Sequence, residues 1–266
     1  MDLQLSGKRA VVTGGSRGIG KAIARALASE GVEVVIAARM AGPLEEAANE
    51  IAAATGSRVV PVTADTGDTG SVRALVASAV STLGGVDILV NNAAKPGGQG
   101  PVPSLQEITE EAFNEDMNIK VMGYLRCARE VASHMAQNGW GRIINISGMA
   151  SRNSGSTIGS IRNVAVSAMT KNLADELGPR GINVTVVHPG ATRTEATEGV
   201  IARRADASGL SPAAVEKQMA ESNSIRRLLT AHDIANVVTF LASPLSVAIN
   251  GDSIAAGGGV GRGIYY

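Results

Sequence analysis

The glycine-rich stretch Thr-Gly-Gly-Ser-Arg-Gly-Ile-Gly at residues 13–20 constrains the fold of this chain more than any other feature. An apolar run, residues 10–12, precedes it, and an alanine-rich helical pattern, residues 21–29, follows it. Strand, glycine turn and helix in this order bring the backbone close to a ligand and leave free N–H groups at the helix start. A dinucleotide pyrophosphate fits such a place. A tight turn without a ligand is the alternative, and the flanking strand and helix count against it.

The composition is typical of one large α/β domain that spans residues 1–266. The chain has 24 basic and 24 acidic residues, so its net charge is zero and no long basic run indicates a nucleic acid partner. Its single cysteine, Cys127, excludes an internal disulfide and favours a reducing, cytoplasmic location. We expect no membrane partner and no metal, because no apolar run approaches a membrane span and no histidines or cysteines have metal-ligand spacing.

Strand and helix patterns alternate along the chain, with no repeat or linker between them. After the first strand, we expect strands at residues 32–38, 59–63, 86–90, 142–147, 183–188 and 253–256. We expect helices at residues 43–55, 69–83, 108–117, 121–137, 160–177 and 232–241. The polar segment 194–227 should carry two short helices, the second near residues 212–221. This alternation predicts an α/β fold with one doubly wound parallel sheet of about seven strands and helices on both faces.

Ligands of such sheets bind at the carboxyl ends of the strands, and polar or glycine-rich residues follow the predicted strands of this chain. In strand order they are residues 14–20, Arg39, Asp65 and Thr66, residues 91–94, Ser147 and residues 189–194. A purely structural sheet needs no such chemistry at these ends. The sequence therefore predicts a ligand site along this edge.

These segments together resemble the classical short-chain dehydrogenase/reductase family, over almost the whole chain, and its members similar to 3-oxoacyl-acyl-carrier-protein reductases. The family's motifs are matched by the glycine pattern at residues 13–20, the adenine-bracketing aspartate Asp65, the Asn-Asn-Ala-Ala stretch at residues 91–94, the helix asparagine Asn118 and the proline-glycine turn and threonine within residues 189–194. The resemblance implies a Rossmann-type nicotinamide cofactor site, a small-molecule substrate, a substrate lid at residues 194–227 and a homotetramer.

The resemblance also implies which residues contact the cofactor. They are Gly14, Ser16, Arg17, Gly18, Ile19, Gly20, Arg39, Asp65, Thr66, Asn92, Ala93, Pro189, Gly190, Thr192 and Thr194. Charge favours NADP(H) over NAD(H), because an NAD site generally has an acid at the end of the second strand, where this chain has Ala38 and Arg39. Arg17 and Arg39 suit a 2′-phosphate, although Arg39 lying along the surface without this role is the alternative.

The catalytic positions of the family are the main departure. The family's chemistry rests on Ser, Tyr and Lys, with Tyr and Lys four residues apart on one helix. Here the Tyr position is Gly159, the Lys position is Asn163, and the Ser position is Gly148 with Ser147 beside it. Of the four expected polar groups only Asn118 is unchanged. We therefore name Asn118, Ser147 and Asn163 as the candidate catalytic residues.

A placed proton donor is worth roughly 10²–10⁴-fold in rate, so its loss would require another group. On an ideal helix Lys120 and Tyr124 face away from the side of Asn118, unless the helix breaks there. Arg162 shares the face of Gly159 and could supply positive charge, with a solvated helix charge as the alternative.

Three functions fit this sequence. The favoured one is an NADP(H)-dependent oxidoreductase with a degenerate site, whose proton comes from water, Lys120, Arg162 or the substrate. The others are a binding or regulatory protein that holds the nucleotide without turnover, and a non-redox activity such as elimination or hydration. Tyr265 and Tyr266 at the chain end could reach a site, or be frayed. We favour the oxidoreductase because the cofactor pattern is retained; nothing in the sequence identifies the substrate.

Overall fold

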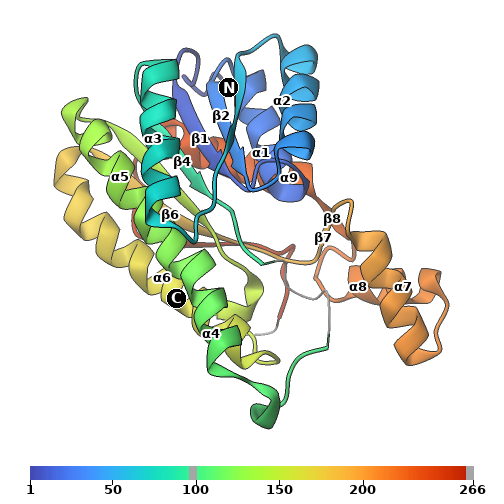
Figure 1. Ribbon diagram of the computed structural model, residues 1–266. Helices are drawn as coiled ribbons and strands as arrows, with labels where there is room; N and C mark the ends of the chain where they lie inside the picture. Colours follow the sequence, from blue (N-terminus) through green and yellow to red (C-terminus); the bar gives the residue numbers. More distant parts are fainter. Residues whose placement is uncertain (96–100, 262–266) are drawn as a thin grey trace.

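The computed structural model describes residues 1–95 and 101–261, and the calls on Tyr265 and Tyr266 lie outside this range (Figure 1). Seven described strands form one parallel sheet in the order β3-β2-β1-β4-β5-β6-β9. Their bounds are β1 (Arg9–Thr13), β2 (Glu33–Ala38), β3 (Val59–Thr63), β4 (Ile88–Asn91), β5 (Gly141–Ile146), β6 (Ile182–Pro189) and β9 (Ser253–Ala256). The predicted doubly wound parallel sheet is confirmed.

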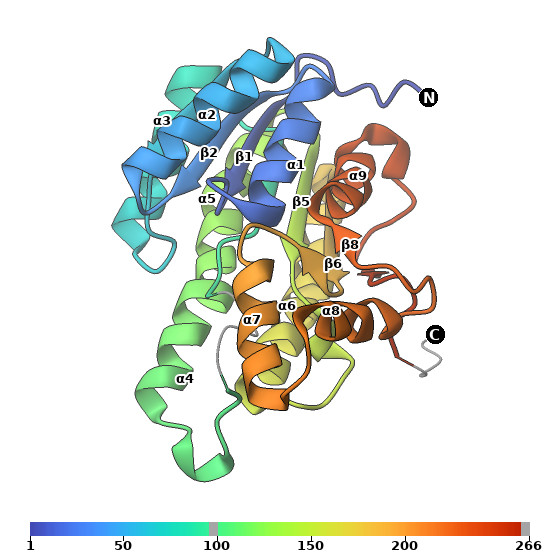
Figure 2. The ribbon, with the colours of Figure 1, turned by 90° about the vertical axis from the view of Figure 1, so that its right-hand side faces the viewer.

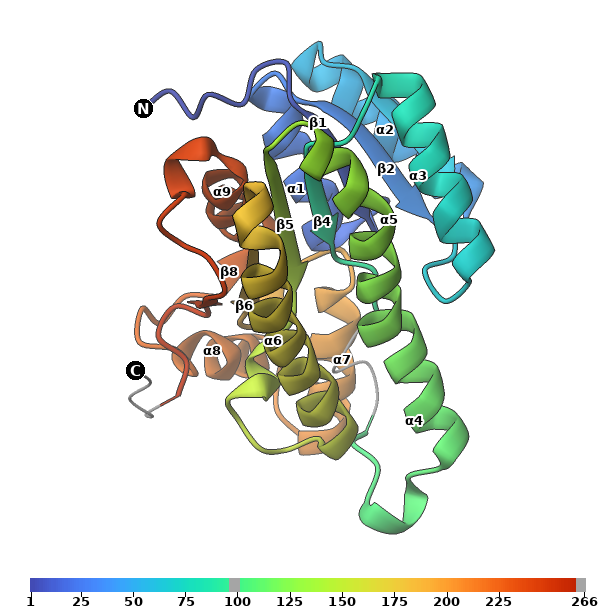
Figure 3. The same ribbon diagram turned by 90° about the vertical axis from the view of Figure 1, so that its left-hand side faces the viewer.

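Helices cover both faces of this sheet. They are α1 (Gly18–Ser29), α2 (Ala41–Thr55) and α9 (Ala231–Ala242) on one face, and α3 (Thr69–Leu83), α5 (Gly123–Gln137) and α6 (Thr157–Leu177) on the other (Figure 2, Figure 3). Side chains along a strand alternate between the faces, so Val12 packs in the core under α1 while Val11 packs in the core under α3. Both cores consist mostly of small aliphatic side chains, as expected for a parallel sheet buried on two faces.

β1 and β4 lie side by side in the sheet although they are not consecutive strands. The predicted ligand crevice lies between their carboxyl ends. At their carboxyl ends the Thr13 hydroxyl oxygen accepts hydrogen bonds from the backbone N–H groups of Asn92 (3.0 Å) and Ala93 (3.1 Å). The Asn92 side-chain amide donates in return to the carbonyl oxygens of Thr13 and Gly14, both at 3.1 Å. These bonds fix the glycine turn of β1 against the segment that follows β4.

One long helical path differs from the prediction of two separate helices before β5. α4 (Glu110–Met117) continues through the π-helical turn η2 (Asn118–Met122) into α5 (Figure 1). A π-turn inserts residues into a helix and changes the direction of the side chains around it. This change decides which residue of the path reaches the site.

Side chains cap two of the helix starts. α3 begins at Thr69, as predicted, and the carboxylate of Asp68 caps it by accepting a hydrogen bond from the Ser71 N–H (2.6 Å). α6 begins at Thr157, three residues before the predicted start at residue 160, because the Ser156 hydroxyl caps it by accepting from the Gly159 N–H (3.1 Å). Short 3₁₀ turns occupy Leu105–Glu107, Met149–Ser151, Gly178–Arg180 and Pro244–Ser246.

The polar segment 194–227 carries the two expected helices, α7 (Thr197–Ser208) and α8 (Pro212–Glu221). They project beside the carboxyl edge of the sheet and share a small apolar core made by Ile201, Ala205, Val215, Met219 and Leu228 (Figure 1). A two-stranded ladder, β7 (Thr192–Arg193) with β8 (Leu229–Thr230), joins their base. Within the described ranges, no helix has the length and apolar character needed to cross a membrane.

Candidate active site

The glycine turn after β1 has the geometry of an anion cradle. Gly14 and Gly18 adopt positive φ angles of 68° and 57°, which glycine reaches without strain. A Cβ on Gly20 would lie 2.2 Å from the Gly14 carbonyl oxygen, so α1 can begin this close to the turn only with glycine there. The packing therefore requires glycine at the predicted positions.

A carboxylate of this chain already bonds at the start of α1. The Gly18 N–H donates to Oε2 of Glu195, an exposed residue just before α7, over 2.9 Å. A helix start binds anions through such free N–H groups and its dipole. Glu195 thus acts as a stand-in for an anionic ligand, and the cradle fits a phosphate group.

The predicted cofactor residues lie along the same sheet edge. Thr194 faces the turn, since a Cβ on Gly18 would lie 3.4 Å from its methyl carbon. Asp65 is exposed after β3, and its carboxylate accepts from the Gly67 N–H (2.8 Å). The others at this edge are Ser16, Ile19, Thr66, Asn92, Ala93, Pro189, Gly190 and Thr192.

Two arginines are available at the end of β2. Arg17 and Arg39 are exposed, and their side chains make no hydrogen bond or ion pair with the residues that the structure describes. No acid stands at the β2 end, where Ala38 is followed by Arg39. Both guanidinium groups are therefore free to meet a phosphate.

Ser147 and Asn163, two of the predicted catalytic residues, contact each other. The Ser147 hydroxyl donates to Oδ1 (3.2 Å) and to the backbone oxygen (3.3 Å) of Asn163. A Cβ on Gly148 would lie 3.2 Å from the Asn163 amide nitrogen. A Cβ on Gly159, one turn earlier on α6, would lie 2.8 Å from the Ser156 hydroxyl. The Ser156 hydroxyl, which caps α6, thus lies in close contact with the place where a side chain at residue 159 would begin.

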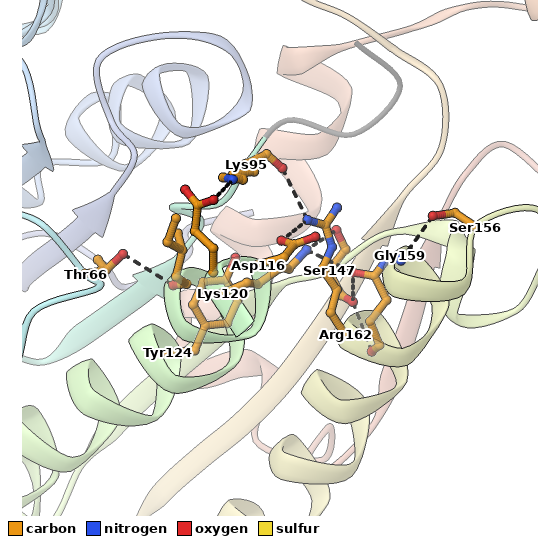
Figure 4. Close-up of polar contacts among 12 residues, drawn as sticks. Thr66, Lys95, Asp116, Lys120, Tyr124, Ser147, Ser156, Gly159 and Arg162 are labelled. Carbon is orange, nitrogen blue, oxygen red and sulfur yellow. Dashed lines mark hydrogen bonds and ion pairs between the residues drawn. The ribbon is translucent and has the colours of Figure 1, made fainter. Parts of the chain in front are cut away.

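Lys120 completes this group from the opposite helix (Figure 4). Its Nζ donates to Asn163 Oδ1 (3.0 Å) and to the backbone oxygen of Ser147 (3.1 Å). Lys120 does face away from Asn118, as expected, but the side it faces is that of Ser147 and Asn163, whereas Asn118 contacts Gly67 and Arg126. A sequence signal was present: Lys120 lies one turn before Tyr124 on the buried stripe that continues through Cys127 and Val131.

Tyr124 turns towards the sheet as well, and so also away from the contacts that Asn118 makes with Gly67 and Arg126. Its hydroxyl donates to the Ile146 carbonyl oxygen (2.8 Å), next to Ser147, and the side chain is fully buried. Burial raises the pKa of Tyr124 far above its ordinary value, with Arg162 acting weakly in the opposite direction. This hydroxyl therefore stays protonated and committed to the backbone.

Asn118, the third predicted catalytic residue, contacts the loop after β3. Its amide nitrogen donates to the Gly67 carbonyl oxygen (3.1 Å), and its Oδ1 accepts from the Arg126 guanidinium (2.7 Å). Lys120, and not Asn118, makes the hydrogen bonds to Ser147 and Asn163. The structure thus brings Ser147 and Asn163 together and leaves Asn118 one turn away.

Comparison with known proteins agrees with this geometry. Residues 14–261 match the family model described as enoyl-(acyl carrier protein) reductase. The chain is 34% identical over 260 residues to 7alpha-hydroxysteroid dehydrogenase of Escherichia coli K12, covering 97% of this chain and 96% of that protein. The chain belongs to the short-chain dehydrogenase/reductase family.

Two solved structures of the family show how closely the fold is shared. L-sorbose reductase from Gluconobacter frateurii, complexed with NADPH and L-sorbose, has a TM-score of 0.93 at 31% identity and covers 99% of this chain and 100% of its own. 7alpha-hydroxysteroid dehydrogenase complexed with NADH and 7-oxo glycochenodeoxycholic acid has a TM-score of 0.87 at 32% identity and covers 97% and 96%. One relative is thus seen with NADPH and another with NADH.

The environment of Lys120 favours its neutral amine. The residue is only 3% exposed, and burial lowers its pKa to about 7 from an ordinary 10.5. The positive charge of Arg162 lowers this pKa further, and the negative charge of Asp116 opposes both effects. Both hydrogen-bond partners are neutral oxygens, so the ammonium has no direct counter-ion. An amine whose pKa is lowered in this way, beside the carboxyl ends of the strands, is a candidate general acid or base.

His188 does not share this role. Its Nδ1 lies 3.0 Å from the Ser151 hydroxyl and 3.2 Å from the Gly148 carbonyl oxygen, and burial lowers its pKa to about 4. It is therefore neutral and bonded to the turn after β5. In the described parts of the chain, no group of three or more His, Cys, Asp or Glu side chains could hold a metal ion.

Arg162 is buried, contrary to the interpretation of it as a solvated charge. Its guanidinium donates to the Asp116 carboxylate (2.5 Å) and to the Lys95 carbonyl oxygen (3.4 Å), and the two side chains are 10% and 15% exposed (Figure 4). The pair links α6 to α4 and to the loop that follows β4. Lys95 also pairs with Glu115, so Lys120 is left as the cation beside the site whose hydrogen-bond partners are both neutral.

A cavity of about 600 Å³ lies between the sheet edge and the helices α7 and α8. Its walls are mainly apolar, from Met149, Ala191, Val215, Met219 and Val260. Arg204 on α7, an exposed residue, also lines it. A cavity of this size and lining suits the body of a small organic molecule.

The buried amine makes a testable contribution to stability. Between pH 7 and 10.5 the unfolded chain holds a proton on Lys120 that the folded chain has released. The free energy of unfolding should therefore rise with pH in this window, by up to about 1.4 kcal/mol per pH unit. Lys120→Met removes this rise. Urea denaturation at several pH values should give stability–pH curves for the two proteins that differ in slope between pH 7 and 10.5 and approach each other as the pH rises; parallel curves across this window would contradict the assignment.

Proposed function

We propose that this protein is an NADP(H)-dependent oxidoreductase that interconverts a carbonyl compound and an alcohol, with Lys120 as its acid–base group. The observation that carries the proposal is the Lys120 amine held by Asn163 and Ser147 at the carboxyl edge of the sheet. It replaces the tyrosine that the family uses, from the opposite side of the site. Ser147 and Asn163 remain in the catalytic set, and Asn118 supports η2 through its contacts with Gly67 and Arg126.

Several features support NADP(H) as the cofactor. The cradle accepts the Glu195 carboxylate as it would accept a phosphate, and Arg17 and Arg39 suit a 2′-phosphate at a β2 end that lacks an acid. L-sorbose reductase was solved with NADPH, although another relative was solved with NADH. When bound, NADP(H) supplies or receives the hydride. The residues that would hold it are the cofactor set predicted from the sequence.

The amine of Lys120 handles the proton. In the reductive direction the protonated Nζ donates a proton to the carbonyl oxygen as the carbon gains hydride, and the product is the alcohol. In the oxidative direction the neutral Nζ accepts the hydroxyl proton. Asn163 Oδ1 and the Ser147 carbonyl orient the amine for either step. A pKa near 7 lets both forms be populated near neutral pH.

A small-molecule substrate with an apolar body would occupy the cavity under α7 and α8, with residues 194–227 as its lid. We also propose the homotetramer and the cytoplasmic location that the resemblance and the single cysteine imply. Chromatography with light scattering tests the assembly.

Nucleotide binding without turnover is the second candidate. The observation that favours it is Gly159, which has no side chain at the position of the family's tyrosine, and whose added Cβ would lie only 2.8 Å from the Ser156 hydroxyl. Tight NADPH binding with no oxidation by any carbonyl compound would select this function over the first.

Arg39 should set cofactor selectivity. We expect NADPH to bind more tightly than NADH in a titration that follows nicotinamide fluorescence, because only NADPH carries the 2′-phosphate. Arg39→Gln should weaken NADPH binding by roughly tenfold, about 1.4 kcal/mol, and leave NADH unchanged. Arg58→Gln, an exposed arginine at the opposite edge of the sheet, is the matched control. An equal loss for both nucleotides would argue against a 2′-phosphate contact.

Glu195 should compete with the nucleotide for the Gly18 N–H. Glu195→Gln removes the negative charge that occupies the cradle, so NADPH should bind several-fold more tightly. Glu198→Gln, which changes the exposed carboxylate of the second residue of α7, should have little effect. The same fluorescence titration measures both, and weaker binding in Glu195→Gln would mean that this carboxylate assists the nucleotide.

Lys120 should control the pH dependence of turnover. Carbonyl reduction needs the ammonium, so kcat/KM should fall as pH rises through about 7, and alcohol oxidation should rise through the same pH. Lys120→Met should lower both rates by roughly 10²–10⁴-fold and leave the NADPH dissociation constant within a few-fold. Tyr124→Phe is the control, because its hydroxyl is committed to Ile146. If Tyr124→Phe abolished turnover and Lys120→Met did not, the assignment would fail.

A further inference from the structure

The Arg162 guanidinium is only partly satisfied by the protein. One terminal nitrogen, Nη1, donates to Asp116 and to the Lys95 carbonyl oxygen. The Nε is buried and has no hydrogen-bond partner among the described residues, and Nη2 makes no hydrogen bond with them either. The whole residue is 8% exposed, and the Nε lies out of reach of solvent, so water does not compensate for its missing bond.

A buried N–H without a partner is rare in a folded protein, because it loses water and gains nothing in return. The Nε and Nη2 groups lie side by side on one planar edge of the guanidinium. Such an edge forms two parallel hydrogen bonds to a carboxylate. Asp116 pairs with the other side of the group, so this edge is free for a second, external carboxylate.

The position of this edge ties it to the reaction. Arg162 directly precedes Asn163, whose Oδ1 accepts the hydrogen bond from the Lys120 amine. Arg162 also lies about one turn beyond Gly159 on α6 (Figure 4). Residue 159 is the position where the family has its tyrosine. An anionic group there would also offset the repulsion between Arg162 and the Lys120 ammonium. Asp116 is the one carboxylate that bonds Arg162 in the described structure.

We propose that the unpartnered edge of Arg162 binds the carboxylate of the substrate, so that the substrates are oxo acids and the corresponding hydroxy acids. The inference rests on the proposed oxidoreductase function and names its substrate class. The carboxylate pairs with Arg162 while the carbonyl oxygen of the same molecule meets Lys120. The apolar body extends towards the cavity under α7 and α8.

Binding of acids and their esters tests this class directly. Levulinate and 2-oxovalerate are each compared with their methyl esters, by calorimetric titration of the NADPH-loaded protein and by steady-state reduction. We expect at least one acid to bind about tenfold or more tightly than its ester. Arg162→Gln should abolish this preference and leave the affinity for the ester nearly unchanged. Arg162→Lys, which keeps the charge without the planar edge, should restore part of it.

Arg204→Gln is the matched control, because Arg204, unlike Arg162, lines the cavity itself and could meet an anion there. A preference that disappears in Arg204→Gln and survives in Arg162→Gln would overturn the assignment, as would equal binding of acids and esters to the wild type. Because Arg162→Gln also changes the charge beside Lys120, its effect on kcat should be similar for acid and ester. Arg162→Gln should raise the KM of the acid and leave the KM of the ester unchanged.

The readouts separate this proposal from the function it rests on. Reduction of esters and acids at equal efficiency would retain the oxidoreductase and reject the carboxylate site. Acid-selective binding without NADPH oxidation would retain the site and reject the oxidoreductase. Thermal unfolding of each variant shows whether it is folded, and Arg162→Lys remains informative if Arg162→Gln is not.

Discussion

The hydrogen bonds that Thr13 accepts from Asn92 and Ala93 connect two strands that are far apart in the sequence, and the ligand edge depends on them. They fix the turn after β1 against the segment after β4, at the point where the strand order changes direction. The crevice of a doubly wound sheet opens at such a point. The close approach of Gly20 to Gly14 then sets the start of α1, so that its free N–H groups face the crevice.

Much of the fold could be predicted from the sequence because its signals are local. Apolar runs such as Val34 to Ala37 can only be buried strands, and glycine at positions 14 and 18 marks turns that need positive φ. Polar residues after each strand, such as Asp65, predict the ligand edge, because all parallel strands end on the same side. Ser147 and Asn163 are named as candidates from the family resemblance, and the structure adds that their side chains are hydrogen-bonded to each other.

The remaining features of the site come from tertiary contacts that no local pattern specifies. The position of Lys120 depends on η2, a change of helical period that ideal geometry does not anticipate. Arg162 has the sequence context of a surface residue, and only its contacts with Asp116 and Lys95 reveal that it is buried. The Ser156 cap, too, becomes visible only once α6 begins three residues earlier than its pattern indicates.

The proposed exchange of a tyrosine for Lys120 as the acid–base group has a physical consequence that would account for Asn163. Burial raises the pKa of a tyrosine, as it does for Tyr124, so an acid of this type needs a nearby cation to bring its pKa down. For a lysine, burial and a nearby cation act in the same direction. Lys120 reaches a pKa of about 7 mainly through burial, with Arg162 as a secondary cause. A lysine at position 163 is then no longer needed to adjust the acid, and the neutral amide of Asn163 can instead orient it.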